Sequence, residues 1–524
     1  MTDTPTTSPP PVATRGALRE AGYRPRSVKD EVRANLIAAL RAGETVFPGL
    51  LGYERSVIPQ VQHALLARHD FILLGLRGQA KTRLVRSLPA LLDEWMPAVA
   101  GAEIHDDPFA PISKAARDLV AEAGDETPVT WIHRSRRYGE KLATPDTSIA
   151  DLIGDVDPIK AATRKLTYAD EETIHFGLIP RLHRGIFAIN ELPDLQPRIQ
   201  VGLLGVMEEQ DVQIRGFAVR LPVDVLMVFT ANPEDYTNRG AIITPLKDRI
   251  ASQILTHYPR DLETGVEITR QEAWTERADA DGGVSVHIPH VFREIVEQVA
   301  FEARASEYVD QKSGVSARLT RAALEALVSA AERRAILHGE TAATLRASDL
   351  AAVEPAVTGK VELVYEGEQE GAVAVARALV GRAVAATMRR YLPDLADKSR
   401  PAEGERPTGR AAWNEVLTWF ARGRTVELDS DMRADAYRSA LDGVAGLGAL
   451  VDRHAPGGTP DERAAMMELA LETLHQHSLL GKEVAADGGS AYTDLVGSVL
   501  SGLGSFGPDD EDDDFDDRSE RRRR

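Results

Sequence analysis

The pattern of apolar and polar positions divides the chain into a first half of mixed strands and helices and a largely helical second half. Short apolar runs at 71–74, 185–189 and 225–229 are typical of strands that are buried on both faces. Between these runs, apolar residues recur at the three- and four-residue spacing of amphipathic helices. Because strands that alternate with helices favour a parallel sheet, residues 29–274 are expected to form an α/β domain.

One of the predicted helices follows directly on the run at 71–74. It begins at Lys81, and apolar side chains continue at helical spacing through Leu84, Leu88, Leu91, Leu92 and Trp95. Strand, loop and helix therefore follow one another closely at this point of the chain.

The pattern of the second half predicts amphipathic helices. Changes of composition indicate the boundaries between its parts. A polar stretch at 275–283 and a Pro-, Gly- and Glu-containing stretch at 400–409 are typical of linkers. The expected parts are a disordered leader at 1–28, the α/β core at 29–274, a helical domain at 284–398, a helical C-terminal module at 410–505 and an acidic disordered tail at 506–524.

Composition narrows the class of protein. The 524 residues include no cysteine, which removes disulfides, zinc–cysteine sites, iron–sulfur clusters and thiol nucleophiles, and suits a reducing compartment. The N-terminus lacks the apolar core of a signal peptide, and no apolar run reaches the length of a membrane span. A net charge of −19 disfavours nucleic acid as a partner, because a nucleic-acid backbone requires a basic face. We therefore expect a cytoplasmic protein without a membrane span.

Two charged segments allow more than one interpretation. The acidic run Asp509–Asp517 repels itself and is expected to be disordered, either as a solubilising tail or as a docking peptide for a basic or metal-bearing partner. The basic run Arg134–Arg137 lies close to Trp131, a combination that can contact nucleic acid. A short solvated segment of the α/β core is the preferred interpretation of this basic run.

The segment Gly75–Thr82, with the sequence GLRGQAKT, carries the most chemical information. It matches the phosphate-binding pattern G-x-x-x-x-G-K-[ST] except that Ala80 stands in the place of the last glycine. Backbone N–H groups of such a loop, together with the N-terminus of the following helix, form a cradle for phosphate oxygens. The sequence therefore predicts nucleotide binding through Gly75, Gly78, Gln79, Ala80, Lys81, Thr82 and Arg83.

A second polar site is expected where Asn190 and Glu191 follow the run at 185–189. An Asp-Glu pair at such a strand end holds a Mg²⁺-bound water through the Asp and polarises the attacking water through the Glu. A full charge about 5 Å from the metal contributes roughly 3 kcal/mol per unit of metal charge at an effective dielectric of about 20. Because Asn190 lacks this charge, we expect weaker Mg²⁺ binding and slow hydrolysis, with Glu191 as the general base.

Further polar positions follow in order along the core. Asn232 comes after the third apolar run, where its side chain would reach the γ-phosphate or the attacking water. The preceding segment, 209–221, is expected to form a hairpin that turns at Arg215 and Gly216. Near the end of the core, Arg249 would stabilise charge on the transferring phosphate if it acted across a subunit interface.

In this order, the motifs resemble those of the AAA+ ATPases, specifically the clade that contains the MoxR-like ATPases and the ATPase subunit of magnesium chelatase. The likeness covers residues 46–249 well and the following helical region more loosely. By this resemblance Gly75–Thr82 is the Walker A loop, Asn190–Glu191 is the end of Walker B, and Asn232 is sensor 1. MoxR-like members also use alanine at the position of Ala80.

The resemblance implies roles for further residues. Arg249 is the arginine finger that reaches the nucleotide of a neighbouring subunit, and Arg318 is the sensor 2 residue of a lid formed by 284–398. Hairpins at 151–185 and 209–221 resemble the insertions of the clade that precede Walker B and sensor 1. The C-terminal module has no counterpart in the resemblance.

The resemblance also implies a function. A ring, typically a hexamer, would bind ATP and Mg²⁺ between its subunits, with Thr82 and Asn190 at the Mg²⁺, and would hydrolyse ATP through Glu191, Asn232, Arg249 and Arg318. Hydrolysis would remodel or load, in a chaperone-like manner, a partner protein with a von Willebrand factor A domain. Two alternatives stay open: an ATP-binding ring that is a non-catalytic scaffold because of Asn190, and a DNA-dependent AAA+ regulator, which the net charge disfavours.

Overall fold

The chain forms two compact units in the computed structural model. The sheet unit comprises residues 1–268 and 310–318, and the helical unit comprises residues 269–309 and 319–524. The structure describes residues 8–157, 159–160, 163, 171–208, 211–213, 220–233, 240–278, 282–397, 408–484 and 489–495.

The sheet unit is built around a five-stranded sheet in which every pair of neighbouring strands is parallel. The apolar runs predicted as buried strands are three of its members, because their side chains are covered on both faces. The predicted α/β fold with a parallel sheet is therefore confirmed. In spatial order, the strands are β11 (Ser252–Leu255), β1 (Phe71–Leu74), β10 (Val225–Ala231), β7 (Gly185–Asn190) and β4 (Tyr138–Leu142).

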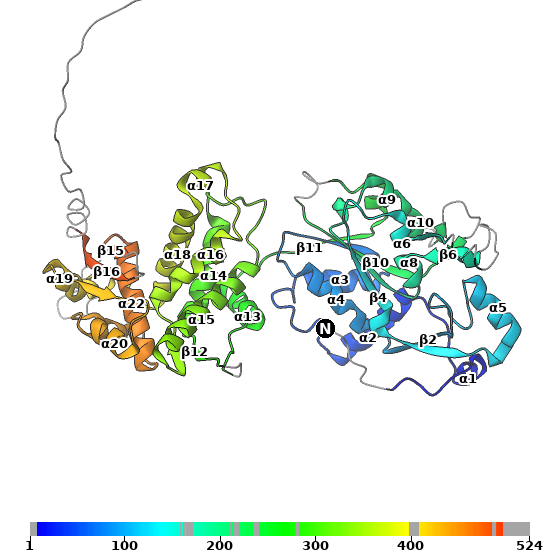
Figure 1. Cartoon of the computed structure of the whole chain (residues 1–524), viewed down its shortest axis with the longest axis horizontal. Coiled ribbons are helices and arrows are strands. Elements are labelled where there is room, and N and C mark those ends of the chain that lie inside the picture. The colour runs from blue at the N-terminus through cyan, green and yellow to red at the C-terminus, as the bar shows by residue number, and fades with distance from the viewer. Residues whose placement is uncertain are drawn as a thin grey trace, which may run out of the picture. The chain divides into compact units, whose positions relative to one another are not determined.

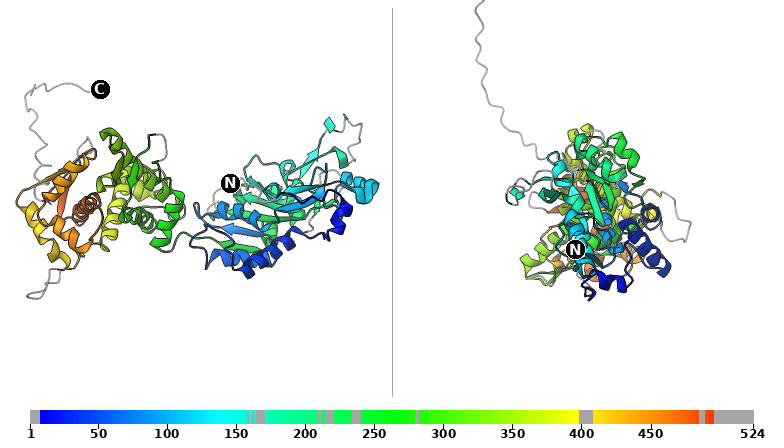
Figure 2. Two further views of the ribbon diagram at one scale, coloured as in Figure 1. Left: turned by 90° about the horizontal axis from the view of Figure 1, so that it is seen from below. Right: turned by 90° about the vertical axis from the view of Figure 1, so that its right-hand side faces the viewer.

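Helices cover both faces of this sheet (Figures 1 and 2). Side chains alternate along a strand, so Leu73 of β1 enters one core and its neighbour Leu74 enters the other. The core around Leu73 is closed by α2 (Val28–Ala42), α3 (Val57–Leu66), α4 (Lys81–Ser87) and the 3₁₀ helix η1 (Leu88–Leu91). The core around Leu74 is closed by α6 (Ile149–Leu152), α8 (Leu178–Arg181), α9 (Pro197–Gly202), α10 (Leu204–Glu208) and α12 (Thr244–Arg249).

Short antiparallel pairs and one further helix surround the central sheet. The pairs are β2 (Trp95–Val99) with β3 (Val129–His133), β5 (Gly154–Val156) with β6 (Ile174–Phe176), and β8 (Asp211–Gln213) with β9 (Arg220–Pro222). The helix is α5 (Lys114–Ala123). The two hairpins that the sequence predicted at 151–185 and 209–221 thus have paired strands, while the turn at Arg215 and Gly216 lies outside the described residues.

The helix predicted from Lys81 to Trp95 is shorter than expected. It ends as α4 at Ser87, where η1 follows with Pro89 near its start. Proline has no N–H to donate and therefore does not continue the α-helical bonding. Trp95 lies in β2 instead.

Residues 8–28, which the sequence assigned to a disordered leader, are packed on the sheet unit. They contain helix α1 (Arg15–Glu20), whose Leu18 is 1% exposed. The Trp131 indole donates to the carbonyl of Val12 at 2.8 Å. One apolar side chain and a few hydrogen bonds are enough to hold this segment, so its sequence can be mostly polar.

The helical unit joins the predicted lid and the predicted C-terminal module. Helix α18 (Ala372–Met388) packs against both α14 (His290–Ala305) and α22 (Pro460–Gln476). Because α22 is buried along most of its length, the two regions share one interior rather than forming separate domains. Its other helices are α13 (Leu262–Glu272), which starts in the sheet unit, α15 (Arg318–His338), α16 (Glu354–Thr358), α17 (Tyr365–Glu370), α19 (Asn414–Ala421), α20 (Ala434–Asp442) and α21 (Leu447–His454).

The helical unit also contains strands that the sequence did not predict. β14 (Val426–Leu428), β16 (Ser490–Asp494) and β15 (Leu480–Val484) form an antiparallel sheet in that order, and β12 (Ser285–His287) pairs with β13 (Ala342–Thr344). In the described part of the chain, none of the helices has both the length and the apolar character needed to cross a bilayer.

Candidate nucleotide-binding site

The loop from Gly75 to Ala80 connects the carboxyl end of β1 to the start of α4. Two of its residues are left-handed: Gly78 with φ = 75° and Ala80, the N-cap of α4, with φ = 52°. Consecutive turns of this kind direct backbone N–H groups toward one side, as in anion-binding loops. Ala80 therefore keeps the left-handed backbone conformation expected of the glycine that it replaces, at a typical expense of about 1 kcal/mol for a residue with a Cβ.

Lys81 is held against the same loop. It is 8% exposed, and its ammonium group donates to the carbonyl oxygen of Gly75 and, at 3.0 Å, to that of Leu76. Both acceptors are neutral. A phosphate that entered the loop would replace a neutral acceptor with a charged one, which forms a stronger hydrogen bond.

Side chains that the sequence did not single out fix the shape of the loop. The Tyr53 hydroxyl donates to the carbonyl of Gln79 at 2.7 Å, and the Thr256 hydroxyl lies 2.7 Å from Gln79 Oε1. Burial raises the pKa of Tyr53 to about 12, so its phenol stays a donor at neutral pH. A Cβ on Gly75 would lie 1.9 Å from Thr256 Oγ1, which explains why a glycine occupies this position.

The ends of three neighbouring strands lie level at one edge of the sheet. Leu74 of β1 pairs with Ala231 of β10, and the N–H of Gly75 donates to the carbonyl of Ala231 at 3.2 Å. On the other side of β10, the register with β7 continues to the residue before Asn190. The loop after β1, Asn232 after β10, and Asn190 at the end of β7 therefore share the carboxyl edge, where ligands bind in open parallel sheets.

Thr230 of β10 connects this edge to the end of β7. It is 2% exposed, accepts the N–H of Glu191 at 3.2 Å and donates at 3.2 Å to Oδ1 of Asn190. One hydroxyl thus fixes the backbone of the predicted general base and the side chain of the residue before it. No sequence pattern indicated this role, because Thr230 lies within a run that is typical of a buried apolar strand.

Glu191 has a left-handed backbone, with φ = 54° and ψ = 51°. Only five non-glycine residues of the described chain have positive φ, and Glu191 and Ala80 are both at the carboxyl edge. Such conformations in non-glycine residues typically require about 1–3 kcal/mol and concentrate at functional sites. The conformation results from the Thr230 contact and from the 3₁₀ turn Leu192–Asp194 that begins directly after Glu191.

The residues at this edge fit Mg²⁺ as a sparse set of oxygen donors. Mg²⁺ at nucleotide sites is usually held by one or two protein oxygens together with phosphates and water. Thr82 at the exposed start of α4, the amide oxygen of Asn190 and the carboxylate of Glu191 are the oxygens available for this purpose. Asn190 contributes a dipole without a charge, so Glu191 supplies the only negative charge of the three.

The predicted arginine finger is paired within its own chain. Arg249, at the end of α12, donates through Nε to the carboxylate of Glu208 at 2.7 Å, and its Nη1 donates to the carbonyl of Pro245 at 3.0 Å. In this ion pair the Glu208 side chain is exposed, whereas the Arg249 side chain is only partly exposed, at 28%. The function of Arg249 in a neighbouring subunit stays a prediction.

The segment 310–318 belongs to the sheet unit although helices of the other unit flank it in sequence. Arg77 Nε donates to the carbonyl of Ser313 at 3.1 Å, and a Cβ on Gly78 would lie 2.1 Å from Ser316 Oγ. The N–H of Arg318 donates to that same Ser316 oxygen at 3.1 Å. Arg318, the predicted sensor 2 residue, therefore lies two residues from a contact with the phosphate loop.

Comparison with known proteins gives weak similarities. No family model matches the chain. NtrX from Brucella abortus is similar at a TM-score of 0.32 and 15% identity over 60% of this chain, and the match spans 62% of NtrX, which is less than two thirds of its length. NtrX in complex with ADP gives a TM-score of 0.34 and 13% identity over 71% of this chain and 67% of NtrX.

A model of the complex between subunits BchI and BchD of magnesium chelatase is similar at a TM-score of 0.31 and 22% identity, over 62% of this chain and 98% of that one. At these values the similarities assign no residue of this chain a role. The function is therefore argued from the geometry of the strand ends.

Proposed function

We propose that this chain is an ATPase of the AAA+ type, related to the MoxR-like and magnesium chelatase ATPases, that binds ATP and Mg²⁺ at the carboxyl edge of its sheet. The observation that carries the proposal is the level register of β1, β10 and β7. It brings a phosphate loop with a buried lysine together with Asn232 and with Glu191.

Each side chain then has a defined task. Lys81 leaves the loop carbonyls and binds the β- and γ-phosphates, and Thr82 directs its hydroxyl toward Mg²⁺. Bound Mg²⁺ supplies positive charge to the phosphate oxygens. Glu191, with its backbone fixed by Thr230, accepts a proton from the attacking water, and Asn232 orients that water.

Two arginines complete the site if the chain forms a ring. Arg318 stabilises developing phosphate charge within the chain, and its closeness to the loop through Ser316 supports this role. Arg249 is proposed to act on the nucleotide of a neighbouring subunit, after leaving Glu208. The Arg249 side chain is partly exposed, which supports an action outside its own chain.

The work of hydrolysis is proposed to be done on another protein. Members of the resembling clade act with partners that carry a von Willebrand factor A domain, whose metal accepts a carboxylate. The acidic run Asp509–Asp517, which lies outside the described residues, offers such carboxylates. Stimulation of ATP hydrolysis by a purified protein of this kind, and its loss on deletion of 506–524, is the test of the partner.

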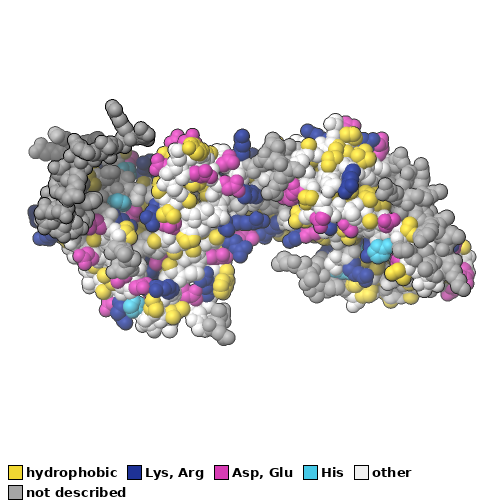
Figure 3. All heavy atoms as spheres, turned by 45° about the horizontal axis from the view of Figure 1, so that its top comes forward, with side chains coloured by type: hydrophobic (Ala, Val, Ile, Leu, Met, Phe, Trp, Pro, Cys, Tyr) yellow, Lys and Arg dark blue, Asp and Glu magenta, His cyan; other side chains and the backbone are white. Residues whose placement is uncertain are grey.

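A second candidate function is a ring that binds ATP without turnover, and the uncharged Asn190 favours it. A DNA-dependent regulator has less support. On the face drawn in Figure 3, basic and acidic side chains are interspersed, whereas binding to a nucleic-acid backbone needs a basic surface.

Steady-state hydrolysis and nucleotide binding, measured on the same samples, distinguish these functions. An ATPase loses turnover in Lys81→Ala and in Glu191→Gln, and Glu191→Gln still binds ATP. Glu126→Gln makes the same change at an exposed carboxylate of the sheet unit and should leave both properties intact. A scaffold binds ATP in the wild type but shows no turnover, and absence of both binding and turnover refutes the site.

The action of Arg249 in a neighbouring subunit is tested by mixing two inactive variants. Lys81→Ala retains Arg249, and Arg249→Gln retains Lys81, so a mixed ring contains interfaces with both residues intact. Recovery of hydrolysis on mixing supports action between subunits. Sizing of each variant with nucleotide shows whether it still assembles, and assembly of the mixture without recovery refutes the role.

A further inference from the structure

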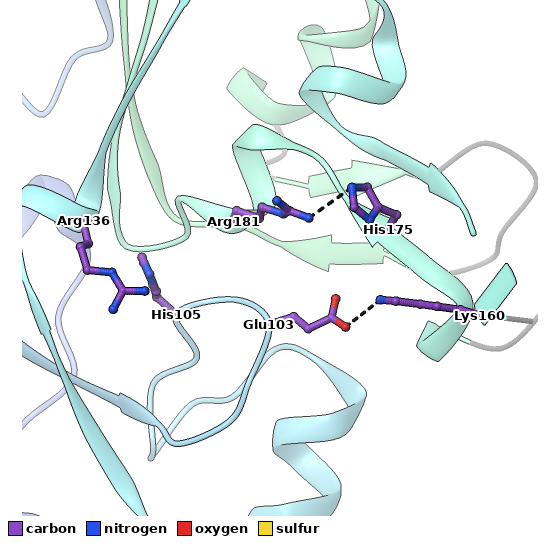
Figure 4. Close-up of a pocket in the computed structure, with 6 residues that line it drawn as sticks. All are labelled: Glu103, His105, Arg136, Lys160, His175 and Arg181. Carbon is purple, nitrogen blue, oxygen red and sulfur yellow. Dashed lines mark hydrogen bonds and ion pairs between the residues drawn. The ribbon is translucent and has the colours of Figure 1, made fainter. Parts of the chain in front are cut away.

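The sheet unit has a hollow that is lined mostly by basic side chains and lies apart from the carboxyl edge. Its volume is about 480 Å³, within the range of small-molecule sites. The lining side chains come from the loop after β2, from the turn before β4, from the β5–β6 region and from α8 (Figure 4), and they are Glu103, His105, Arg136, Lys160, His175 and Arg181.

The positive charge of this hollow is only partly balanced. Lys160 pairs with Glu103 at 2.7 Å. Arg181 Nη2 lies 3.2 Å from Nε2 of His175. Within the described residues, neither Arg136 nor Arg181 has a carboxylate partner. Two exposed arginine side chains thus line a hollow in which the one carboxylate of the described residues, Glu103, is already paired.

Two neighbouring arginines outside the hollow, unlike Arg136 and Arg181, are paired with carboxylates. Arg137, next to Arg136 in sequence, is fully buried and donates to both carboxylate oxygens of Glu31, at 2.7 and 2.6 Å. Arg184 pairs with Asp107 at 3.0 Å. The basic run at 134–137, expected to be a solvated segment, is therefore divided between a buried ion pair and the hollow.

His105 lies in the wall of the hollow near Arg136 (Figure 4). Among the described residues, its buried Nδ1 has no hydrogen-bond partner. Burial and the charges of Arg137 and Arg136 lower the pKa of His105 to about 4, so the imidazole is neutral at physiological pH. The hollow thus combines cationic side chains with one neutral imidazole.

We propose that this hollow binds a multiply charged oxyanion, a small molecule that carries phosphate, at a site separate from the carboxyl edge. Arg136 and Arg181 supply planar donors for phosphate oxygens, and the imidazole of His105 lies in the wall of the hollow.

His105 provides a local probe for this site. The protein contains 13 histidines, and with ring-labelled histidine the His105 signal is assigned by its absence in His105→Gln. Inorganic pyrophosphate should shift this signal with saturation and raise the pKa of His105, because a nearby anion favours the imidazolium. Sodium chloride at equal ionic strength should change neither the His105 signal nor the pKa of His105. Inorganic phosphate, titrated in parallel, shows whether one phosphate group is enough.

The variants decide the assignment. Arg136→Gln and Arg181→Gln should each raise the apparent dissociation constant for pyrophosphate about tenfold, as expected for loss of one charge-assisted contact. Arg41→Gln, at an exposed position of α2 outside the hollow, should not change it. The proposal is overturned if pyrophosphate does not change the His105 signal, or if the signal changes equally in the variant that combines Arg136→Gln with Arg181→Gln. The local signal is independent of nucleotide binding at Lys81.

Discussion

Asn190→Asp is the substitution that tests the site most directly. It replaces the amide nitrogen with a carboxylate oxygen and leaves the size of the side chain unchanged. The Thr230 hydroxyl, which already donates to Oδ1 of Asn190, would donate to the new carboxylate. Two effects oppose the gain, namely the negative charge of the adjacent Glu191 and the desolvation of the new carboxylate. The substitution therefore changes charge at the metal with little change of geometry.

The expected gain in Mg²⁺ affinity follows from Coulomb energies. At an effective dielectric of about 20, a carboxylate about 5 Å from a divalent ion contributes roughly 7 kcal/mol of attraction. Repulsion from Glu191 at about 7 Å removes roughly 2 kcal/mol at the same dielectric, and desolvation of a half-buried carboxylate removes several more. A net gain of about 2 kcal/mol corresponds to roughly 30-fold tighter Mg²⁺ binding.

The assay is the binding of a fluorescent ATP analogue as a function of Mg²⁺ concentration, followed by steady-state hydrolysis. Asn190→Asp should lower the half-saturating Mg²⁺ concentration about 30-fold and increase turnover. Asn414→Asp adds the same charge at the exposed start of α19 and is the matched control. Identical Mg²⁺ dependence in wild type and Asn190→Asp would refute the placement of Asn190 at the metal. Turnover that appears only in Asn190→Asp would favour the scaffold function for the natural chain.

Three further substitutions or conditions test the surroundings of the site. Gly78→Ala should lower both the thermal stability and the nucleotide affinity, because φ is 75° and the new Cβ would meet Ser316 Oγ at 2.1 Å; unchanged values would contradict this contact. Thr230→Val keeps the shape of the side chain but removes the acceptor of the Glu191 N–H, so the free energy of unfolding should fall by about 1–3 kcal/mol. Turnover should fall more than the affinity for ADP. Burial lowers the pKa of His183 to about 3, so the imidazole stays neutral in the folded state, whereas in the unfolded state it becomes protonated below about pH 6.5. Urea unfolding should therefore show full stability above pH 6.5 and a loss of up to about 1.4 kcal/mol per pH unit below it, whereas a flat profile would exclude this linkage.

The sequence predicted the parallel sheet because three of its strands, β1, β7 and β10, are buried on both faces and form continuous apolar runs. The edge strands β4 and β11 are partly exposed and have no such run. The leader was harder to predict, because Leu18 and a few hydrogen bonds hold it without a periodic pattern. The strands β14–β16 are short and lie among strongly helical segments, where local spacing does not reveal pairing between residues far apart in sequence.

Part of the candidate site also had a sequence signal. The phosphate loop and the Asn190–Glu191 pair were recognisable because each follows an apolar run, and the register brings them to one edge. Thr230 and Ser316 gave no such signal, since each acts through a contact that only the folded chain creates. The basic hollow is lined by side chains from separate segments, so no local sequence pattern could predict it.

The backbone at Glu191 bears on the choice between a slow ATPase and a scaffold. A left-handed glutamate requires about 1–3 kcal/mol unless its surroundings impose it. Here Thr230 imposes it through the Glu191 N–H, and the same hydroxyl holds Asn190. With Asn190 in place of an Asp, the proposed metal site carries less negative charge, while Glu191, the proposed general base, stays in a fixed, strained position. A scaffold needs neither the carboxylate nor the strain. The retained geometry therefore favours hydrolysis that is slow because of the metal rather than absent because of the base.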